Sequence, residues 1–507
     1  MKQTWQQSKK AGIILSYVMI ALNALSSILL VPVYLDCLGV DGYGFYQMIY
    51  SVASYILILD FGIGTVMIRF ISEYKTRKDE RGAENFAAHC AMLIGCVCVA
   101  IIVIGLLLRG ELASIYKSLT AEKVVLGQKM FLLMIAVLVM TVIERYYEGL
   151  IMANDSFSVA KLISIVKLGV KFGLVIVFLY GNLGVISLVY VDVIVEILAL
   201  AMYIFYNQCH LKFKIKLHCF DKSLFKPMAT FMAAIMLQSI VAYLNNTVDK
   251  TILGIMLGET ASGIYGLSMT FITLFNMIPT VILTIFLPQA TRMVVQGAPM
   301  DKHTQMATNL GRYQMVVCGG ILSAFVVLGR DFISLWAGTT VNEIWLTALI
   351  IMIPNAVPLI QNYCLNVLDA MNKRMFRSAT LLGLSVLNVG LTIMMIKWWG
   401  YIGAAIATAV AYVIGHGIVI NIYYHKKIGI NIIAMWKGIL HRLFPCVLIV
   451  TVLTLPLMMW NNTGWVTFLC KCIIWGLVYV AMLFVMGLKQ DEKQMCYSFV
   501  KKLCRRN

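Results

Sequence analysis

Long apolar stretches separated by short polar connections run along the whole chain. Each is close to the roughly 20 residues that an α-helix needs to cross a bilayer. We predict fourteen membrane-spanning helices at residues 12–33, 45–66, 85–108, 129–151, 158–180, 184–206, 227–247, 261–287, 311–336, 343–366, 377–397, 401–424, 440–460 and 464–488. Residues 249–260 extend either the seventh or the eighth of these. Because lipid admits only helices or closed barrels, the pattern predicts an all-α polytopic membrane protein.

Composition excludes two other classes of protein. Of the 507 residues, 61% are hydrophobic and 13% are charged, and the mean hydropathy is +0.86. A soluble globular protein carries about twice this share of charge. A disordered chain would combine low hydrophobicity with high charge. Membrane lipids are therefore the expected surroundings.

The basic residues predict the orientation. The formal net charge of +18 would suggest nucleic-acid binding in a soluble protein. Here, 31 of the 41 lysines and arginines fall on the N-terminal side of the membrane and 7 fall on the other, while Lys167, Lys171 and Lys471 lie within helices. Basic residues collect on the cytoplasmic side, so both termini are predicted to be cytoplasmic, and no nucleic-acid partner is expected.

An internal repeat divides the chain. Leu38-Gly39 and Gly44-Phe45-Tyr46 align with Leu257-Gly258 and Gly263-Ile264-Tyr265 at an offset of 219 residues. At the same offset Gly181 and Gly184 align with Gly400 and Gly403, and Asn154 aligns with Asn372 at 218. The offsets predict two parallel six-helix repeats, at 1–208 and 227–425. A basic cytoplasmic linker, 209–226, joins them, and 426–507 adds a helix pair and a basic tail.

Several motifs resemble a known family. The runs 38–46, 59–64 and 69–74, together with Asp249-Lys250 and the repeat motif that follows, are similar to the signature of polysaccharide exporters. These are lipid-linked oligosaccharide flippases of the multidrug/oligosaccharidyl-lipid/polysaccharide exporter superfamily. The resemblance implies translocation of an undecaprenyl-diphosphate-linked oligosaccharide across the inner (plasma) membrane by alternating access. It also implies a role in lipopolysaccharide or capsule biosynthesis, with a polysaccharide polymerase or glycosyltransferase as partner.

Charges within the fifth and sixth helices are candidates for the transport site. Lys167 and Lys171 share one face of the fifth helix near mid-membrane, and Asp192 and Glu196 are spaced i, i+4 in the sixth. Charges at this depth are costly and mark functional positions. In one interpretation the lysines bind diphosphate or a carboxylate takes a proton; in the other they pair as an interhelical clamp.

Other polar residues allow two interpretations each. Asn23, Gln238 and Asn276 lie on polar stripes of the first, seventh and eighth helices, either as cavity walls or as interhelical hydrogen-bond partners. The resemblance places these helices at the cleft between the halves. Asp60 is either a proton or cation site or a turn carboxylate at a helix break near Gly62. Arg69 either meets diphosphate at the inner mouth or anchors its helix at the cytoplasmic surface.

No motif points to an enzyme, a cofactor or a metal. The chain lacks a phosphate loop, an H-E-x-x-H motif and a Cys/His metal spacing. Transport would then draw on an ion gradient, of protons or sodium. The leading hypothesis is a flippase, and the alternative is a multidrug or organic-cation antiporter of the same superfamily. A polymerase or ligase would need a large external loop, which the pattern does not provide.

Overall fold

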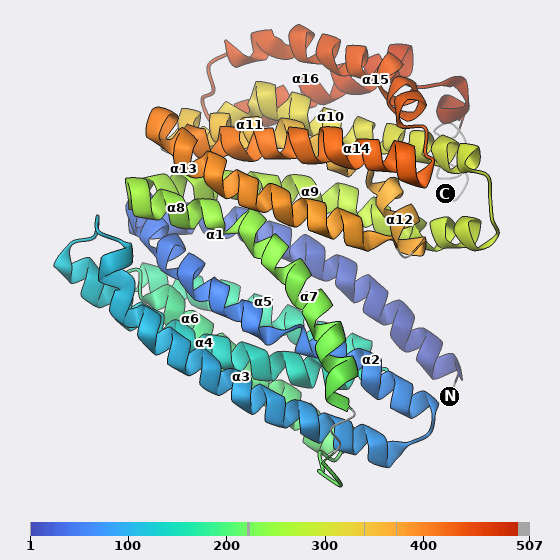
Figure 1. The fold of residues 1–507 in the computed structure, drawn as a ribbon. Coiled ribbons are helices and arrows are strands. Elements are labelled where there is room, and N and C mark those ends of the chain that lie inside the picture. The colour runs from blue at the N-terminus through green and yellow to red at the C-terminus, as the bar shows by residue number, and fades with distance from the viewer. Residues whose placement is uncertain (1, 221–223, 339, 372, 495–507) are drawn as a thin grey trace. The chain divides into compact units, whose positions relative to one another are not determined.

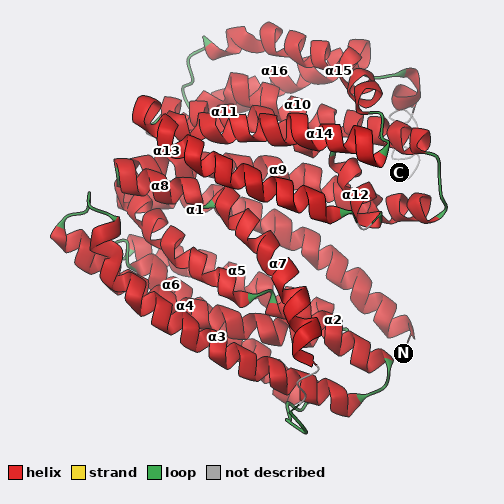
Figure 2. Cartoon of the chain, viewed as in Figure 1, coloured by secondary structure: helices red, strands yellow, loops and turns green. Residues whose placement is uncertain are grey.

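A computed structural model describes residues 2–220, 224–338, 340–371 and 373–494 (Figure 1). Over these ranges the chain forms helices, turns and loops and contains no strand (Figure 2). Asn372 lies outside the described residues. The chain forms two compact units, Met1–Gly266 and Leu267–Asn507, which are taken in turn.

The described residues include eleven helices that are long and apolar enough to cross a membrane, as expected for a multi-pass membrane protein. Two of the eleven segments, Leu15–Thr76 and Phe376–Ile428, each take in two of the predicted spans. In both, a glycine with positive φ, Gly39 or Gly400, separates the two spans. The boundary between adjacent helices is thus a single glycine and not a loop.

The first unit packs its helices around one large apolar core. Its elements are α1 (Lys2–Ile56), η1 (Leu57–Asp60), α2 (Ile63–Thr76), α3 (Glu80–Ile115), α4 (Ala121–Ala153), α5 (Phe157–Tyr180), α6 (Ser187–Tyr206), η2 (Asn207–Leu211), α7 (Phe225–Asn246), α8 (Val248–Leu257) and the start of α9 (Glu259–Val295). Side-chain caps fix two helix starts: Asp79 accepts from the Gly82 N–H before α3, and Thr120 accepts from the Lys123 N–H before α4. The core lies mainly between α1, α2, α3 and α4.

The helix predicted at 45–66 is interrupted. Phe61 and Gly62 both have left-handed backbone (φ 50° and 67°), so the chain leaves α1 through the short 3₁₀ turn η1 and restarts as α2. Asp60 is the last residue of that turn. Gly62 allows the break because it has no Cβ to clash in this conformation.

The repeat motif has the same backbone conformation in both copies. Gly39 and Gly258, which align at offset 219, have φ, ψ of 67°, 177° and 89°, −167°. The aligned glycines Gly44 and Gly263 pack against each other: a Cβ on Gly44 would stand 1.9 Å from the Glu259 carbonyl oxygen. Beside this contact, the Thr260 hydroxyl donates to Asp41 at 2.6 Å. Equivalent segments of the two repeats therefore form a close backbone contact inside the first unit.

The second unit attaches its last two long helices through two buried cations. Its elements after α9 are α10 (Met300–Ala337), α11 (Val341–Ile360), α12 (Asn362–Ala370), α13 (Arg374–Tyr412), η4 (Val413–Val419), α14 (Ile420–Tyr423), η5 (Tyr424–Ile428), α15 (Ile432–Thr454), η6 (Leu455–Met458), α16 (Trp465–Met482) and η7 (Leu483–Gly487). Arg312 of α10 donates to Glu492 at 2.6 Å and to the Gly487 carbonyl at 2.9 Å. Lys471 of α16 donates to Asp331 of α10 at 2.6 Å. Breaking such a buried pair from one side is costly.

Replacing Gly44 by alanine tests the glycine contact. The new methyl group would meet a backbone carbonyl that cannot rotate away, so we expect Gly44→Ala to destabilise the protein by about 1–3 kcal/mol. Gly95→Ala is the control, because nothing lies within 4 Å of a Cβ at that helical glycine; it should be neutral or stabilising. Thermal unfolding of the detergent-solubilised protein measures both, and equal melting temperatures would contradict the contact.

Candidate functional site

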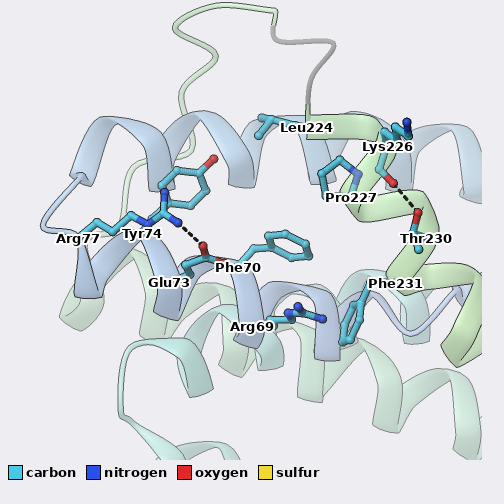
Figure 3. A pocket seen from close by; sticks show the side chains of 10 residues that line it. All are labelled: Arg69, Phe70, Glu73, Tyr74, Arg77, Leu224, Lys226, Pro227, Thr230 and Phe231. Atoms are coloured by element: carbon cyan, nitrogen blue, oxygen red, sulfur yellow. Dashed lines mark hydrogen bonds and ion pairs between the residues drawn. The ribbon is translucent and has the colours of Figure 1, made fainter. Parts of the chain in front are cut away.

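A pocket opens between the C-terminal end of α2 and the N-terminal end of α7 (Figure 3). Its volume is about 880 Å³. One wall comes from α2 and its C-cap, and the other from the start of α7. The lining residues are Arg69, Phe70, Glu73, Tyr74, Arg77, Leu224, Lys226, Pro227, Thr230 and Phe231. The sequence sets both walls: α2 ends at Arg77, and a proline fits the first turn of α7, where no amide hydrogen bond is lost.

The pocket carries a net positive charge. Figure 3 shows Arg77 turned toward Glu73, and their side chains form an ion pair at 2.6 Å. Arg69 instead lies against aromatic rings, with its guanidinium carbon 4.3 Å from the centre of Phe231 and 5.5 Å from that of Phe70. Within the described part of the chain, no carboxylate forms an ion pair with Arg69 or Lys226. These two cations are free to meet an anion, and guanidinium and ammonium groups both suit phosphate oxygens.

A second group of charges lies between α4, α5 and α6. Lys171 on α5 contacts Asp192 on α6 at 2.6 Å, and the other oxygen of Asp192 accepts from the Tyr46 hydroxyl of α1 at 3.2 Å. Lys161, two turns earlier on α5, lies 3.6 Å from Glu148 of α4. The predicted face of α5 is thus turned toward carboxylates.

Lys167 has two carboxylate partners. Its Nζ donates to Glu144 of α4 at 2.6 Å and to Glu196 of α6 at 2.7 Å. Both glutamates are buried, with 7% and 8% of their surface exposed. α5 is therefore joined to a neighbour on each side through one ammonium group.

Asp60 pairs with Arg145 of α4. The aspartate lies at the helix break before Gly62 and is buried, while its other carboxylate oxygen has no hydrogen-bond partner among the described residues. Its position at the end of η1 is that of the turn carboxylate that the sequence allowed, and the ion pair adds a contact between that turn and α4.

The remaining candidates are spread over the chain. The Asn23 amide donates to the Met19 carbonyl one turn earlier on its own helix, at 2.9 Å. Gln238 is exposed on α7. Asn276, on the part of α9 in the second unit, accepts from Asn355 of α11 at 2.7 Å. Asn276 thus makes an interhelical hydrogen bond, and Asn23 bonds within its own helix.

Sequence reasoning missed the contribution of α4 and most of the α2–α7 pocket. Glu144, Arg145 and Glu148 are charged residues within the predicted fourth span, and the same depth criterion that selected Lys167 would have selected them. Lys226 carries no comparable signal, because a lysine at the start of a helix near the membrane surface is ordinary.

A sequence model of the polysaccharide biosynthesis protein family matches residues 10–294, more than half of the chain. No curated protein matches the chain.

Solved structures share the fold. The lipid II flippase MurJ in an inward closed conformation has a TM-score of 0.70 and 15% identity, over 93% of this chain and 97% of that chain. An inward-facing multidrug resistance MATE family transporter of the MOP superfamily has a TM-score of 0.68 and 13% identity, over 84% and 99%. A MOP superfamily transporter from Pyrococcus furiosus has 0.55 and 13%, over 90% and 97%. At these identities the likeness concerns the fold alone.

The Asp60–Arg145 pair makes an asymmetric prediction. The Arg145 side chain is 42% exposed and that of Asp60 is 6% exposed. Arg145→Met leaves a buried carboxylate unpaired and should cost about 3–5 kcal/mol. Asp60→Asn leaves a half-solvated arginine and should cost about 1 kcal/mol or less. Chemical unfolding of the two single variants and of the double variant measures the difference. Equal losses from the two single changes would refute the asymmetry.

Proposed function

Because the chain belongs to the polysaccharide biosynthesis protein family, we propose that it is a flippase that moves an undecaprenyl-diphosphate-linked oligosaccharide across the plasma membrane. It works by alternating access and transports without catalysing a reaction. The observation that carries this proposal is the α2–α7 pocket, where Arg69 and Lys226 have no acidic partner among the described residues and aromatic side chains stand beside them. A diphosphate supplies the negative charge that these cations lack.

The proposed architecture has fourteen spans and cytoplasmic termini. The glycine breaks at Gly39 and Gly400 divide two of the eleven apolar segments, and α9 is 37 residues long, which together support this count. The two six-helix repeats and the helix pair at 426–507 remain our prediction. With the N-terminus inside, the end of α2 and the start of α7 both lie on the cytoplasmic side, where a lipid-linked precursor is made.

The other candidate residues take secondary roles in this proposal. Lys167 and Lys171 already have carboxylate partners, so either would have to exchange a carboxylate for phosphate during transport. Asp60, Asp192 and Glu196 remain candidates for coupling to a proton or sodium gradient. We propose that Asn23, Gln238 and Asn276 contribute to the sugar path. A polymerase or glycosyltransferase would act as the partner on either side of the flipping step.

An organic-cation antiporter is the second candidate. The shared fold with MATE transporters and the buried carboxylates of α4 and α6 favour it. The positive charge of the α2–α7 pocket disfavours it, since like charges repel a cationic substrate.

A flipping assay tests the proposal. In proteoliposomes containing a fluorescent polyprenyl-diphosphate oligosaccharide, we expect Arg69→Gln and Lys226→Gln each to lower the initial rate by about tenfold at low lipid concentration, the loss of one charged hydrogen bond. Lys75→Gln is the matched control, because Lys75 is exposed on the same helix and does not line the pocket. Lys167→Ala and Lys171→Ala test the deeper cations in the same assay.

Two results would contradict the proposal. Wild-type protein that moves no lipid-linked sugar but exchanges organic cations for protons would establish the antiporter. Wild-type flipping that Arg69→Gln and Lys226→Gln leave unchanged would remove the pocket from the transport path.

A further inference from the structure

The charges between α2, α4, α5 and α6 do not balance. Three pairs are one to one: Arg145 with Asp60, Lys161 with Glu148, and Lys171 with Asp192. The remaining cation, Lys167, faces two carboxylates. If every group in this cluster is ionised, one negative charge is in excess, and it is located at the Glu144–Lys167–Glu196 triad.

Burial makes that excess charge expensive. Glu144 and Glu196 are both more than nine-tenths buried, and they accept hydrogen bonds from the same nitrogen. An unpaired charge taken out of water costs several kcal/mol. Two carboxylates that share one site relieve this cost when one of them takes up a proton.

An unsatisfied acceptor lies at the same place. Glu196 Oε1 binds Lys167, whereas Glu196 Oε2 is buried and has no hydrogen-bond partner among the described residues. Buried polar atoms are normally hydrogen-bonded. A protonated Glu144 would supply the missing donor while its other oxygen keeps the bond to Lys167.

We propose that Glu144 and Glu196 together bind one exchangeable proton, in a site closed by Lys167. The proton resides on Glu144 and is shared with Glu196 Oε2. Each group of the cluster then has a partner, and the net charge of the cluster is zero.

The surrounding groups offer no alternative source of neutralisation. The charged and titratable groups that face the triad are Arg145 and Glu148 on α4, Lys161 and Lys171 on α5, Asp192 and Tyr203 on α6, and Tyr46 and Tyr50 on α1. The three cations among them each pair with another carboxylate, and the Tyr203 hydroxyl donates to the Ala160 carbonyl. A sodium ion is disfavoured because the Lys167 ammonium already occupies the space between the two carboxylates.

Infrared difference spectroscopy on the full chain in lipid nanodiscs tests the site. We expect the wild-type protein to show the carbonyl-stretch band of a protonated carboxyl at neutral pH, lost on alkaline titration. Glu144→Gln and Glu196→Gln should each abolish this band, because Lys167 then neutralises the single remaining carboxylate. Glu148→Gln is the control and should keep it, because Glu148 pairs with Lys161 outside the triad.

A third variant guards against a misfolded one. Glutamine has the shape and charge of a protonated glutamic acid, so Glu144→Gln should melt at the wild-type temperature at neutral pH. Lys167→Met removes the cation and should leave a second carboxyl protonated, which roughly doubles the band. A wild-type protein without the band, or a band that survives both glutamine variants of the triad, would overturn the proposal.

The significance of the proton as a coupling ion rests on the proposed flippase function, but the titration itself needs no transported lipid. A band assigned to the triad in a protein that flips nothing would overturn the proposed function and leave the proton site standing. Normal flipping by a protein without the band would do the reverse.

Discussion

A charge in the interior of a membrane protein is tolerated only with a partner, and the first unit is arranged around this requirement. α5 carries three lysines, and each contacts a carboxylate on α4 or α6. The ion pairs hold α5 between its two neighbours at three levels. In an apolar solvent these contacts specify helix rotation more strictly than apolar packing alone, since a small rotation would leave a charge without its partner.

Duplication kept the backbone device and not the charges. The glycine contact joins Gly44 to Gly263 in a close backbone approach that side chains would prevent. By contrast, the positions 219 residues after Lys167, Lys171, Asp192 and Glu196 are Val386, Gly390, Ala411 and Gly415. A Cβ on Gly415 would stand 2.2 Å from a Leu384 methyl group, so the second half is close-packed where the first half has an ion pair. The two repeats therefore share a hinge-like motif but differ in chemistry.

The sequence predicted the parts of this arrangement that follow from local pattern. Apolar length gave the spanning helices, and the repeat gave the equivalent positions of Gly39 and Gly258. The pairing of Lys171 with Asp192 was one of two interpretations that helical spacing allowed. The choice of Glu144 as a partner depends on how α4 is rotated against α5, which is a property of tertiary packing. The α2–α7 pocket escaped for the same reason, because its two walls are about 150 residues apart in the chain.

Depth in the membrane and freedom to bind are different properties, and the structure separates them. Lys167 and Lys171 lie deepest by sequence, yet each is held by carboxylates, so phosphate binding there must displace an existing partner. Arg69 and Lys226 lie at helix ends and have no such partner among the described residues, so a phosphate gains their full attraction. A headgroup should therefore bind first where cations are unpaired. The buried network then responds through the balance of its charges, which one proton changes from negative to neutral.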